Sequence, residues 1–277
     1  MALFTPIKSY SSFRRVALAQ WKDCTEATIQ GALYLDVTET SQYLAKLKQE
    51  HQESVSYGVL VGKAVTHALE AMPEINAKIF GRKIYQKRTI DIFYQVDIGN
   101  GADLSGVVVT DTDQKSLLDI ARFLRERAER LRAGKDEQYE KTQKGGLFKT
   151  LPISWLARLF KLYAFLLYRV KVPPKWLGSD LIDPFGSVMV TNVGRFGVDV
   201  AYAPLIKWTH VPLIVLVGTA REMPTVIDGE LCVHTMLPVS ATIDHRLLDG
   251  AHVGKLSKIM RSYVENPEAF EAERQKT

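Results

Sequence analysis

Hydrophobic and polar positions repeat along the chain with two different periods, and each change of period marks a strand or a helix. Strands are predicted at residues 28–37 and 107–110, a hairpin or one long strand at 84–98, and helices at 40–52, 57–71 and 116–132. From Ser187 onward the pattern is mostly strand until Gly250, after which Ala251–Tyr263 has the apolar spacing of an amphipathic helix. This order predicts an α/β (α+β) fold, in which a mixed sheet and a layer of helices form two layers.

One strand-to-helix turn carries most of the candidate chemistry. Val239, Ala241 and Ile243 alternate along the last predicted strand and bring His245 to its end. Asp249 and a glycine follow, and the final helix starts there. Side chains at such a turn are well placed to meet a ligand.

The residues of this turn resemble a known family. The segment Asp244–Gly250, DHRLLDG, resembles the DHRxxDG signature of the catalytic domain of 2-oxoacid dehydrogenase acyltransferases, and the turn is also similar to that of chloramphenicol acetyltransferase. Four more segments resemble the same acyltransferases in the same order: 63–79, 111–124, 188–197 and 211–231. The resemblance implies a two-layer, chloramphenicol acetyltransferase-like fold, acyl transfer that depends on coenzyme A, and a single catalytic domain over residues 1–277.

Full-length members of that family carry a lipoyl domain and a peripheral-subunit-binding domain ahead of the catalytic domain. Here sequence of the catalytic-domain type begins soon after Met1, and no linker rich in proline, serine or glycine is found. We therefore expect a stand-alone acyltransferase core with no covalently bound lipoyl group.

Acyl transfer from a thioester requires a base for the acceptor's proton and a hydrogen-bond donor for the oxyanion that forms. Imidazole is the side chain whose ordinary pKa lies nearest neutral pH, which favours histidine as the base. The family resemblance assigns the base to His245. It assigns the oxyanion donor to the hydroxyl of Thr191, in the segment VMVTNVG, where serine is commoner in the family.

The resemblance also implies a supporting role for Asp249, which helps to hold the turn and the orientation of the imidazole. Its implied partner is an N-terminal arginine, either Arg14 or Arg15. Asp249 also suits the N-cap position of the helix that follows, and the two roles are compatible.

Three further residues are candidates for contact with the substrate or coenzyme A. Asn192 and Arg195 lie next to the predicted oxyanion donor, and Gly250 lies next to Asp249. Arg195 is equally consistent with a solvated turn residue. For Gly250 we also expect a steric need for glycine at a tight turn.

About forty residues interrupt the family pattern and are predicted as a helical insertion at about 141–186. Within it, residues 155–170 form a helix in which Arg158, Lys161 and Arg169 share one narrow face. Sixteen residues with three charges fall short of the ~20 apolar residues of a transmembrane helix. Three interpretations remain: a helix packed on its own trimer, a wall for a long acyl chain or an apolar acceptor, or an interfacial helix that gives peripheral contact with a membrane.

Members of the family form trimers with the active site between subunits. We therefore expect a homotrimer in which His245 of one subunit and Thr191 of its neighbour share a site. The expected acceptor is a small molecule with a thiol, hydroxyl or amine. Two alternatives are the core of a split dehydrogenase complex that uses a separate lipoyl protein, and a non-catalytic trimeric scaffold that docks through the aromatic, basic helix.

Composition adds a few exclusions. The net charge of +5 suits the phosphates of coenzyme A, and no nucleic-acid-binding motif accompanies it. No second histidine lies at ligand spacing from His245, so no metal is expected. Two distant cysteines and the lack of a signal peptide predict a reducing, cytoplasmic location, with peripheral membrane attachment if residues 155–170 are interfacial.

Overall fold

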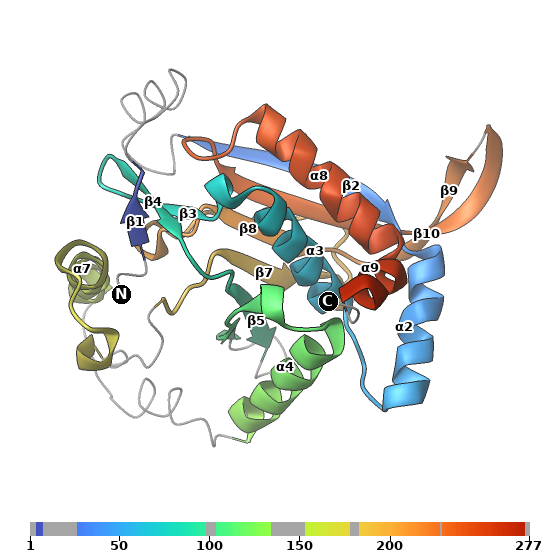
Figure 1. The fold of residues 1–277 in the computed structure, drawn as a ribbon, viewed down its shortest axis with the longest axis horizontal. Helices are drawn as coiled ribbons and strands as arrows, with labels where there is room; N and C mark the ends of the chain where they lie inside the picture. Colours follow the sequence, from blue (N-terminus) through green and yellow to red (C-terminus); the bar gives the residue numbers. More distant parts are fainter. Residues whose placement is uncertain are drawn as a thin grey trace.

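The computed structural model of the chain is built around a mixed β-sheet (Figure 1). It describes residues 4–7, 27–97, 104–133, 153–177, 183–227 and 229–274. Along the sheet the strands follow the order β2 (Thr28–Asp36), β10 (Glu230–Asp244), β8 (Leu213–Val217), β7 (Val188–Asn192), β5 (Ile92–Asp97) and β6 (Leu104–Val109). The β5–β7 and β7–β8 pairs are parallel, and the other pairs are antiparallel. The predicted mixed sheet is confirmed.

Helices cover one face of this sheet. The helices α3 (Tyr57–Ala71) and α8 (Gly250–Glu265) pack against each other over the central strands, and Figure 1 shows α2 (Thr38–His51), α4 (Leu117–Arg132) and α9 (Pro267–Arg274) around them. Alternate residues of β8 divide between the two faces of the sheet, as the strand period requires. Val215 belongs to the main core, whereas Ile214 and Leu216 join a second cluster with Leu205 and Val211.

A small second sheet corrects one prediction. Residues 84–98 form neither a hairpin nor one long strand, because β4 (Lys83–Lys87) pairs with β1 (Phe4–Pro6) and β3 (Ala77–Phe80), while β5 belongs to the large sheet. The break falls at Asp91, a buried carboxylate that accepts hydrogen bonds from Lys87, from Thr89 Oγ1 at 2.9 Å and from the Asp111 amide at 3.0 Å. These polar contacts turn the chain from one sheet into the other.

The predicted helix at 155–170 is present, with a change of winding. The helix α7 (Ile153–Ala164) continues as a π-helical segment, Phe165–Val170. Figure 1 shows α7 at one side of the molecule, beside the small sheet. Phe80 of β3 packs with Ala164 at the end of α7 and with Leu167 and Tyr168 of the π-helical segment. In the part of the chain that the structure describes, no helix has the length and apolar character needed to cross a membrane.

Candidate functional site

His245 lies at the end of β10, on the turn that leads into α8. Its backbone amide donates to the Ala27 carbonyl at 2.7 Å, and its ring Nδ1 lies 2.8 Å from the Leu248 carbonyl oxygen. A carbonyl oxygen only accepts hydrogen bonds, so Nδ1 carries the proton and Nε2 is the basic nitrogen of the neutral ring. The side chain is half-buried. The turn thus fixes both the tautomer and the direction of the imidazole.

The turn itself is held by a buried ion pair between Asp244 and Arg246. Arg246 Nε donates to Asp244 Oδ1 at 2.9 Å and one terminal nitrogen donates to Oδ2 at 2.7 Å, which is the bidentate geometry of a strong arginine–carboxylate pair. Leu247 and Leu248 are 2% and 1% exposed and anchor the same turn in the core. Sequence reasoning missed the supporting role of Arg246, although aspartate and arginine two residues apart gave the signal.

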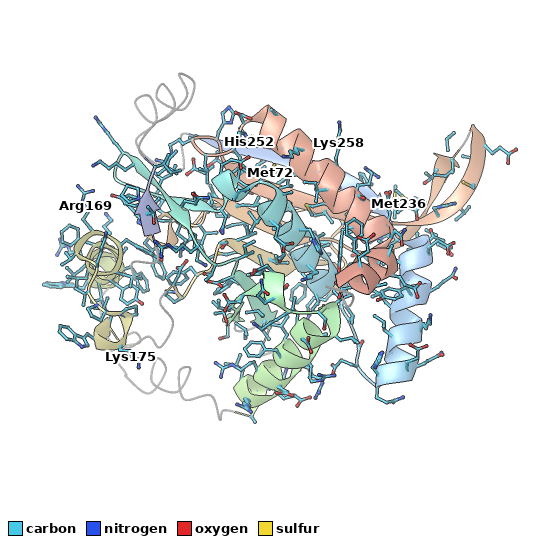
Figure 2. The ribbon with its side chains drawn as sticks, in the orientation of Figure 1. Met72, Arg169, Lys175, Met236, His252 and Lys258 are labelled. Carbon is cyan, nitrogen blue, oxygen red and sulfur yellow. The ribbon has the colours of Figure 1, made fainter. Side chains whose placement is uncertain are left out.

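Asp249 occupies the N-cap of α8, as the sequence indicated. Its carboxylate accepts from the His252 amide at 3.1 Å, and its own backbone amide donates to His252 Nδ1 at 3.4 Å, which completes a capping box. The carboxylate also lies 2.6 Å from His252 Nδ1. Figure 2 places His252 at the start of α8. The spacing Asp-x-x-His gave a signal for this partner, which the sequence prediction did not include. The implied partners Arg14 and Arg15 lie outside the described residues.

Thr191 and Asn192 end β7, at the far end of the sheet from His245. Both are half-buried, and neither side chain forms a hydrogen bond with another described residue. The turn that follows is closely packed, because a Cβ on Gly194 would lie 2.2 Å from the Gly218 carbonyl oxygen. Arg195 is exposed on this turn, with its guanidinium 5.2 Å from the centre of the Phe196 ring.

Within one chain the structure does not bring His245 and Thr191 together. Thr191 aligns with Leu216 of β8, and Leu216 aligns with Ser240 of β10. Five residues of strand and two strand spacings therefore separate Thr191 from His245, or roughly 17 Å along β10 and roughly 10 Å across the sheet. The chain therefore carries two candidate half-sites, His245–Gly250 at one end of the sheet and Thr191–Arg195 at the other.

Gly250 departs from its prediction. It is the first residue of α8, it is not among the glycines with positive φ, and a Cβ added to it would meet nothing within 4 Å. The expected steric need for glycine is therefore wrong within a single chain. The open space beside Gly250 leaves room for a ligand or a neighbouring subunit.

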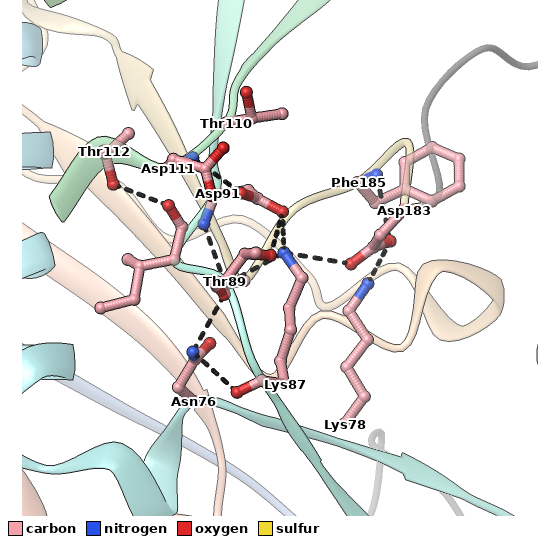
Figure 3. A network of polar contacts seen from close by, with 12 residues as sticks. Asn76, Lys78, Lys87, Thr89, Asp91, Thr110, Asp111, Thr112, Asp183 and Phe185 are labelled. Atoms are coloured by element: carbon pink, nitrogen blue, oxygen red, sulfur yellow. Dashed lines mark hydrogen bonds and ion pairs between the residues drawn. The ribbon is translucent and has the colours of Figure 1, made fainter. Parts of the chain in front are cut away.

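A buried charge network was not predicted (Figure 3). Lys78 Nζ lies 2.7 Å from Asp183 Oδ1, and Lys87 Nζ lies 3.6 Å from Asp183 Oδ2 and also pairs with Asp91. Burial lowers the pKa of Lys78 to about 8, against the attraction of Asp183. Burial alone would raise the pKa of Asp183, but the two ammonium groups hold it below its ordinary value. Tyr168 Oη donates to Asp183 at 3.1 Å and ties the π-helical segment to this network.

No group of histidine, cysteine and acidic side chains that could hold a metal ion occurs among the described residues. The chemistry that these two half-sites support is proton transfer at an imidazole and hydrogen bonding from a hydroxyl. A two-layer mixed sheet with a histidine at a strand-to-helix turn is the arrangement expected of the chloramphenicol acetyltransferase-like class.

Comparison with known proteins agrees with this class. The family model of the 2-oxoacid dehydrogenases acyltransferase (catalytic domain) matches residues 11–148 and 183–271. A dihydrolipoyllysine-residue acetyltransferase component of the pyruvate dehydrogenase complex of Mycoplasma capricolum is 28% identical over 255 residues, which cover 90% of this chain and 48% of that protein. The chain therefore belongs to the 2-oxoacid dehydrogenase acyltransferase catalytic-domain family, and it spans about half the length of the curated relatives it matches.

Solved structures confirm the fold. The dihydrolipoamide acetyltransferase of Azotobacter vinelandii, studied for the role of a serine, a histidine and an asparagine in its catalytic mechanism, superposes with a TM-score of 0.62 at 19% identity, covering 95% of this chain and 93% of that one. A chloramphenicol acetyltransferase superposes with a TM-score of 0.54 at 13% identity, covering 94% and 99%. The predicted chloramphenicol acetyltransferase-like fold is confirmed.

Proposed function

We propose that the protein is an acyltransferase that uses coenzyme A thioesters, with His245 as general base and Thr191 of a neighbouring subunit as oxyanion donor. The observation that carries this proposal is the Nδ1 hydrogen bond of His245 to the Leu248 carbonyl, which makes Nε2 the basic nitrogen. The Azotobacter acetyltransferase studied for a histidine and an asparagine four residues apart adds support, because His245 and Asp249 have the same spacing.

The proposed reaction follows from these two groups. Nε2 of His245 takes the proton of the acceptor's thiol, hydroxyl or amine as that atom attacks the thioester carbonyl carbon. The resulting oxyanion accepts a hydrogen bond from Thr191 Oγ1. When the carbon–sulfur bond breaks, the leaving thiolate of coenzyme A takes the proton from His245. Asp249 holds the first turn of α8, and thereby the position of the catalytic turn.

A homotrimer is proposed because one chain holds the two half-sites too far apart to act on one substrate. Arg195 and Asn192 would then face coenzyme A from the subunit that supplies Thr191. The β9–β10 hairpin adds support: β9 (Arg221–Ile227) and the facing part of β10 extend beyond the sheet (Figure 1), and Val226, Leu231 and Val233 are about two-thirds or more exposed. Apolar side chains gathered at such a projection favour contact with another chain.

We further propose one catalytic domain with a helical insertion at about 141–186. Support comes from the family match, which leaves residues 149–182 between its two matched parts. The acceptor is proposed to be a small molecule or the lipoyl group of a separate protein. A cytoplasmic location and the absence of a bound lipoyl group remain predictions.

The test is release of free coenzyme A from acetyl, octanoyl and palmitoyl donors, with a small thiol or dihydrolipoamide as acceptor. We expect His245→Ala to lower turnover by about 10²- to 10⁴-fold. His51→Ala, at the exposed end of α2, is the matched control and should match the wild type. Turnover with dihydrolipoamide alone would favour a split dehydrogenase complex. Equal activity of His245→Ala and wild type, or a folded trimer without turnover for any donor, would leave the scaffold alternative.

A further inference from the structure

A cavity of about 470 Å³ lies between the inserted helix and the body of the protein. Its buried floor contains Ala164 and Tyr168 from the insert and Phe80 from β3, and His210 lies at its inner side. The volume is in the range of sites for small organic ligands. Nothing in the proposed acyl-transfer chemistry uses this cavity.

The walls are aromatic and already packed. The Phe160 and Trp208 rings stack at 4.7 Å with an angle of 3° between their planes, and the Phe80 and Tyr168 rings stack at 4.7 Å. The Tyr168 hydroxyl is fixed by its hydrogen bond to Asp183, 3.1 Å away. Walls held in this way need little ordering when a ligand enters, which favours binding.

The rim of the cavity is cationic. Lys161, Arg169 and Lys207 line it and are exposed, and no acidic side chain belongs to its described lining. Figure 2 shows Arg169 on the inserted segment. Residues 141–179 contain eight lysines and arginines and no aspartate or glutamate, although the whole chain has a net charge of only +5. An apolar cavity with a cationic rim complements a molecule with an apolar chain and an anionic head.

The inner side of the cavity adjoins the catalytic turn. His210 is two residues from Pro212, whose carbonyl accepts from the Asp244 amide at 2.8 Å. Asp244 in turn holds Arg246, next to His245. Burial, with the positive charges of Lys78 and Arg246, lowers the pKa of His210 to about 4, so the His210 ring itself is neutral at pH 7.

We propose that this cavity binds the hydrocarbon chain of an anionic amphiphile, either a free fatty carboxylate or the acyl chain of a fatty acyl-CoA. The second source rests on the proposed function, and the first does not. The chain would lie among the aromatic side chains, with its head group near Lys161 and Arg169. Because each buried methylene contributes a similar free energy, affinity should rise about fourfold per methylene until the cavity is filled.

Calorimetric titration of the whole protein with hexanoate, octanoate, decanoate and dodecanoate tests the proposal without any catalytic step. We expect saturable binding that tightens with chain length. Ala164→Trp fills the cavity and should weaken decanoate binding at least tenfold, whereas Leu162→Trp, on the exposed side of the same helix, should not. His245→Ala should bind decanoate as the wild type does, so failure of the acyltransferase proposal is distinguishable from failure of this one.

A charge variant keeps the test valid if Ala164→Trp does not fold. Replacing Lys161 and Arg169 by glutamine should weaken decanoate binding and leave 1-decanol binding unchanged, and the exposed pair Lys171 and Lys175 supplies the matched control. If the acyl donor is the source of the chain, Ala164→Trp will reduce turnover of decanoyl-CoA and spare acetyl-CoA. If a free carboxylate is the source, donor preference will not change while decanoate binding is lost. Absence of saturable binding, or equal binding by the wild type and both cavity variants, overturns the proposal.

Discussion

Substitution of the buried carboxylate of Asp183 should lower the free energy of unfolding by a large amount. Its oxygens lie 2.7 Å from Lys78 Nζ and 3.6 Å from Lys87 Nζ, and these three side chains are at most 1% exposed. Asp183→Asn keeps the shape of the side chain and removes its charge. Among the described residues, Asp91 would then be the only carboxylate paired with either ammonium group, through Lys87. Breaking a buried ion pair in this way costs about 3–5 kcal/mol, which is a large share of the stability of a typical domain.

The pH dependence of the stability loss in Asp183→Asn tests whether the missing charge is its cause. Lys78 has a folded pKa of about 8, below its ordinary value of 10.5, so between these pH values the unfolded chain keeps a proton that the folded protein has lost. The contribution of Lys78 to stability therefore rises with pH across this window. Without Asp183 the pKa of Lys78 falls further. Lys78 then avoids the free-energy cost of a buried, unpaired ammonium group by losing its proton. Neutralising an ordinary lysine costs about 4.8 kcal/mol at pH 7 but only about 2 kcal/mol at pH 9.

Urea unfolding followed by circular dichroism at pH 7 and pH 9 measures both effects. We expect the loss of unfolding free energy in Asp183→Asn to be about 1 kcal/mol smaller at pH 9 than at pH 7. Asp199→Asn is the matched control, because its pair with Arg221, at 2.9 Å, is about half exposed and should contribute at most about 1 kcal/mol. A loss in Asp183→Asn no greater than that of the control, or a loss equal at the two pH values, would refute the reasoning.

Three more predictions concern His210, Asp249 and the inserted segment. The pKa of His210 is lowered to about 4 in the folded protein. Below about pH 6.5 the unfolded chain therefore binds a proton at this residue that the folded protein does not bind, and the free energy of unfolding falls as pH falls from 6.5 toward 4. The loss should reach about 2 kcal/mol at pH 5, and His210→Phe should remove it in urea unfolding at pH 7 and pH 5. Asp249→Ala removes the N-cap of α8 and should lower the free energy of unfolding by about 1 kcal/mol, whereas Asp249→Asn retains a capping oxygen and should lose less. If the insert is interfacial, the protein will float with anionic liposomes and a variant with both Trp155→Ala and Trp176→Ala will not. Both side chains are exposed, so the variant should fold. Equal flotation of the variant and the wild type would count against membrane contact through these residues.

Periodicity predicted the regular elements well where one face of an element is buried. The helix at 116–132 and the strand at 28–37 were each predicted to within one residue, because each has a buried or partly buried side and an exposed side. The region 84–98 failed for a physical reason. Its apolar residues belong to two separate sheets, and the turn between them depends in part on the contact of Asp91 with Asp111, which lies 20 residues later in the sequence.

The proposed catalytic turn was predictable because its residues are contiguous. His245 and Asp249 take the places that the strand-to-helix pattern indicated, and the N-cap role of Asp249 is confirmed. The network of Lys78, Lys87 and Asp183 was not predictable, because its members come from two strands and from a segment about a hundred residues later. A lysine that is buried in the fold cannot be distinguished in the sequence from an exposed lysine, and its ion-pair partner is identified only from the structure.

The separation of the two half-sites makes the subunit arrangement testable by mixing variants. If one chain supplied both groups, no mixture of His245→Ala and Thr191→Ala chains would contain an intact site. If each site takes His245 from one subunit and Thr191 from the next, random reassembly of equal amounts should make about a quarter of the sites intact. Because loss of the base or of an oxyanion donor each costs at least about 100-fold, recovery to about a quarter of wild-type turnover would stand far above either variant alone. Coenzyme A release after co-refolding, compared with the two variants refolded apart and then mixed, measures this recovery. Recovery only after co-refolding supports the shared site, and a mixture no more active than its parts would contradict it.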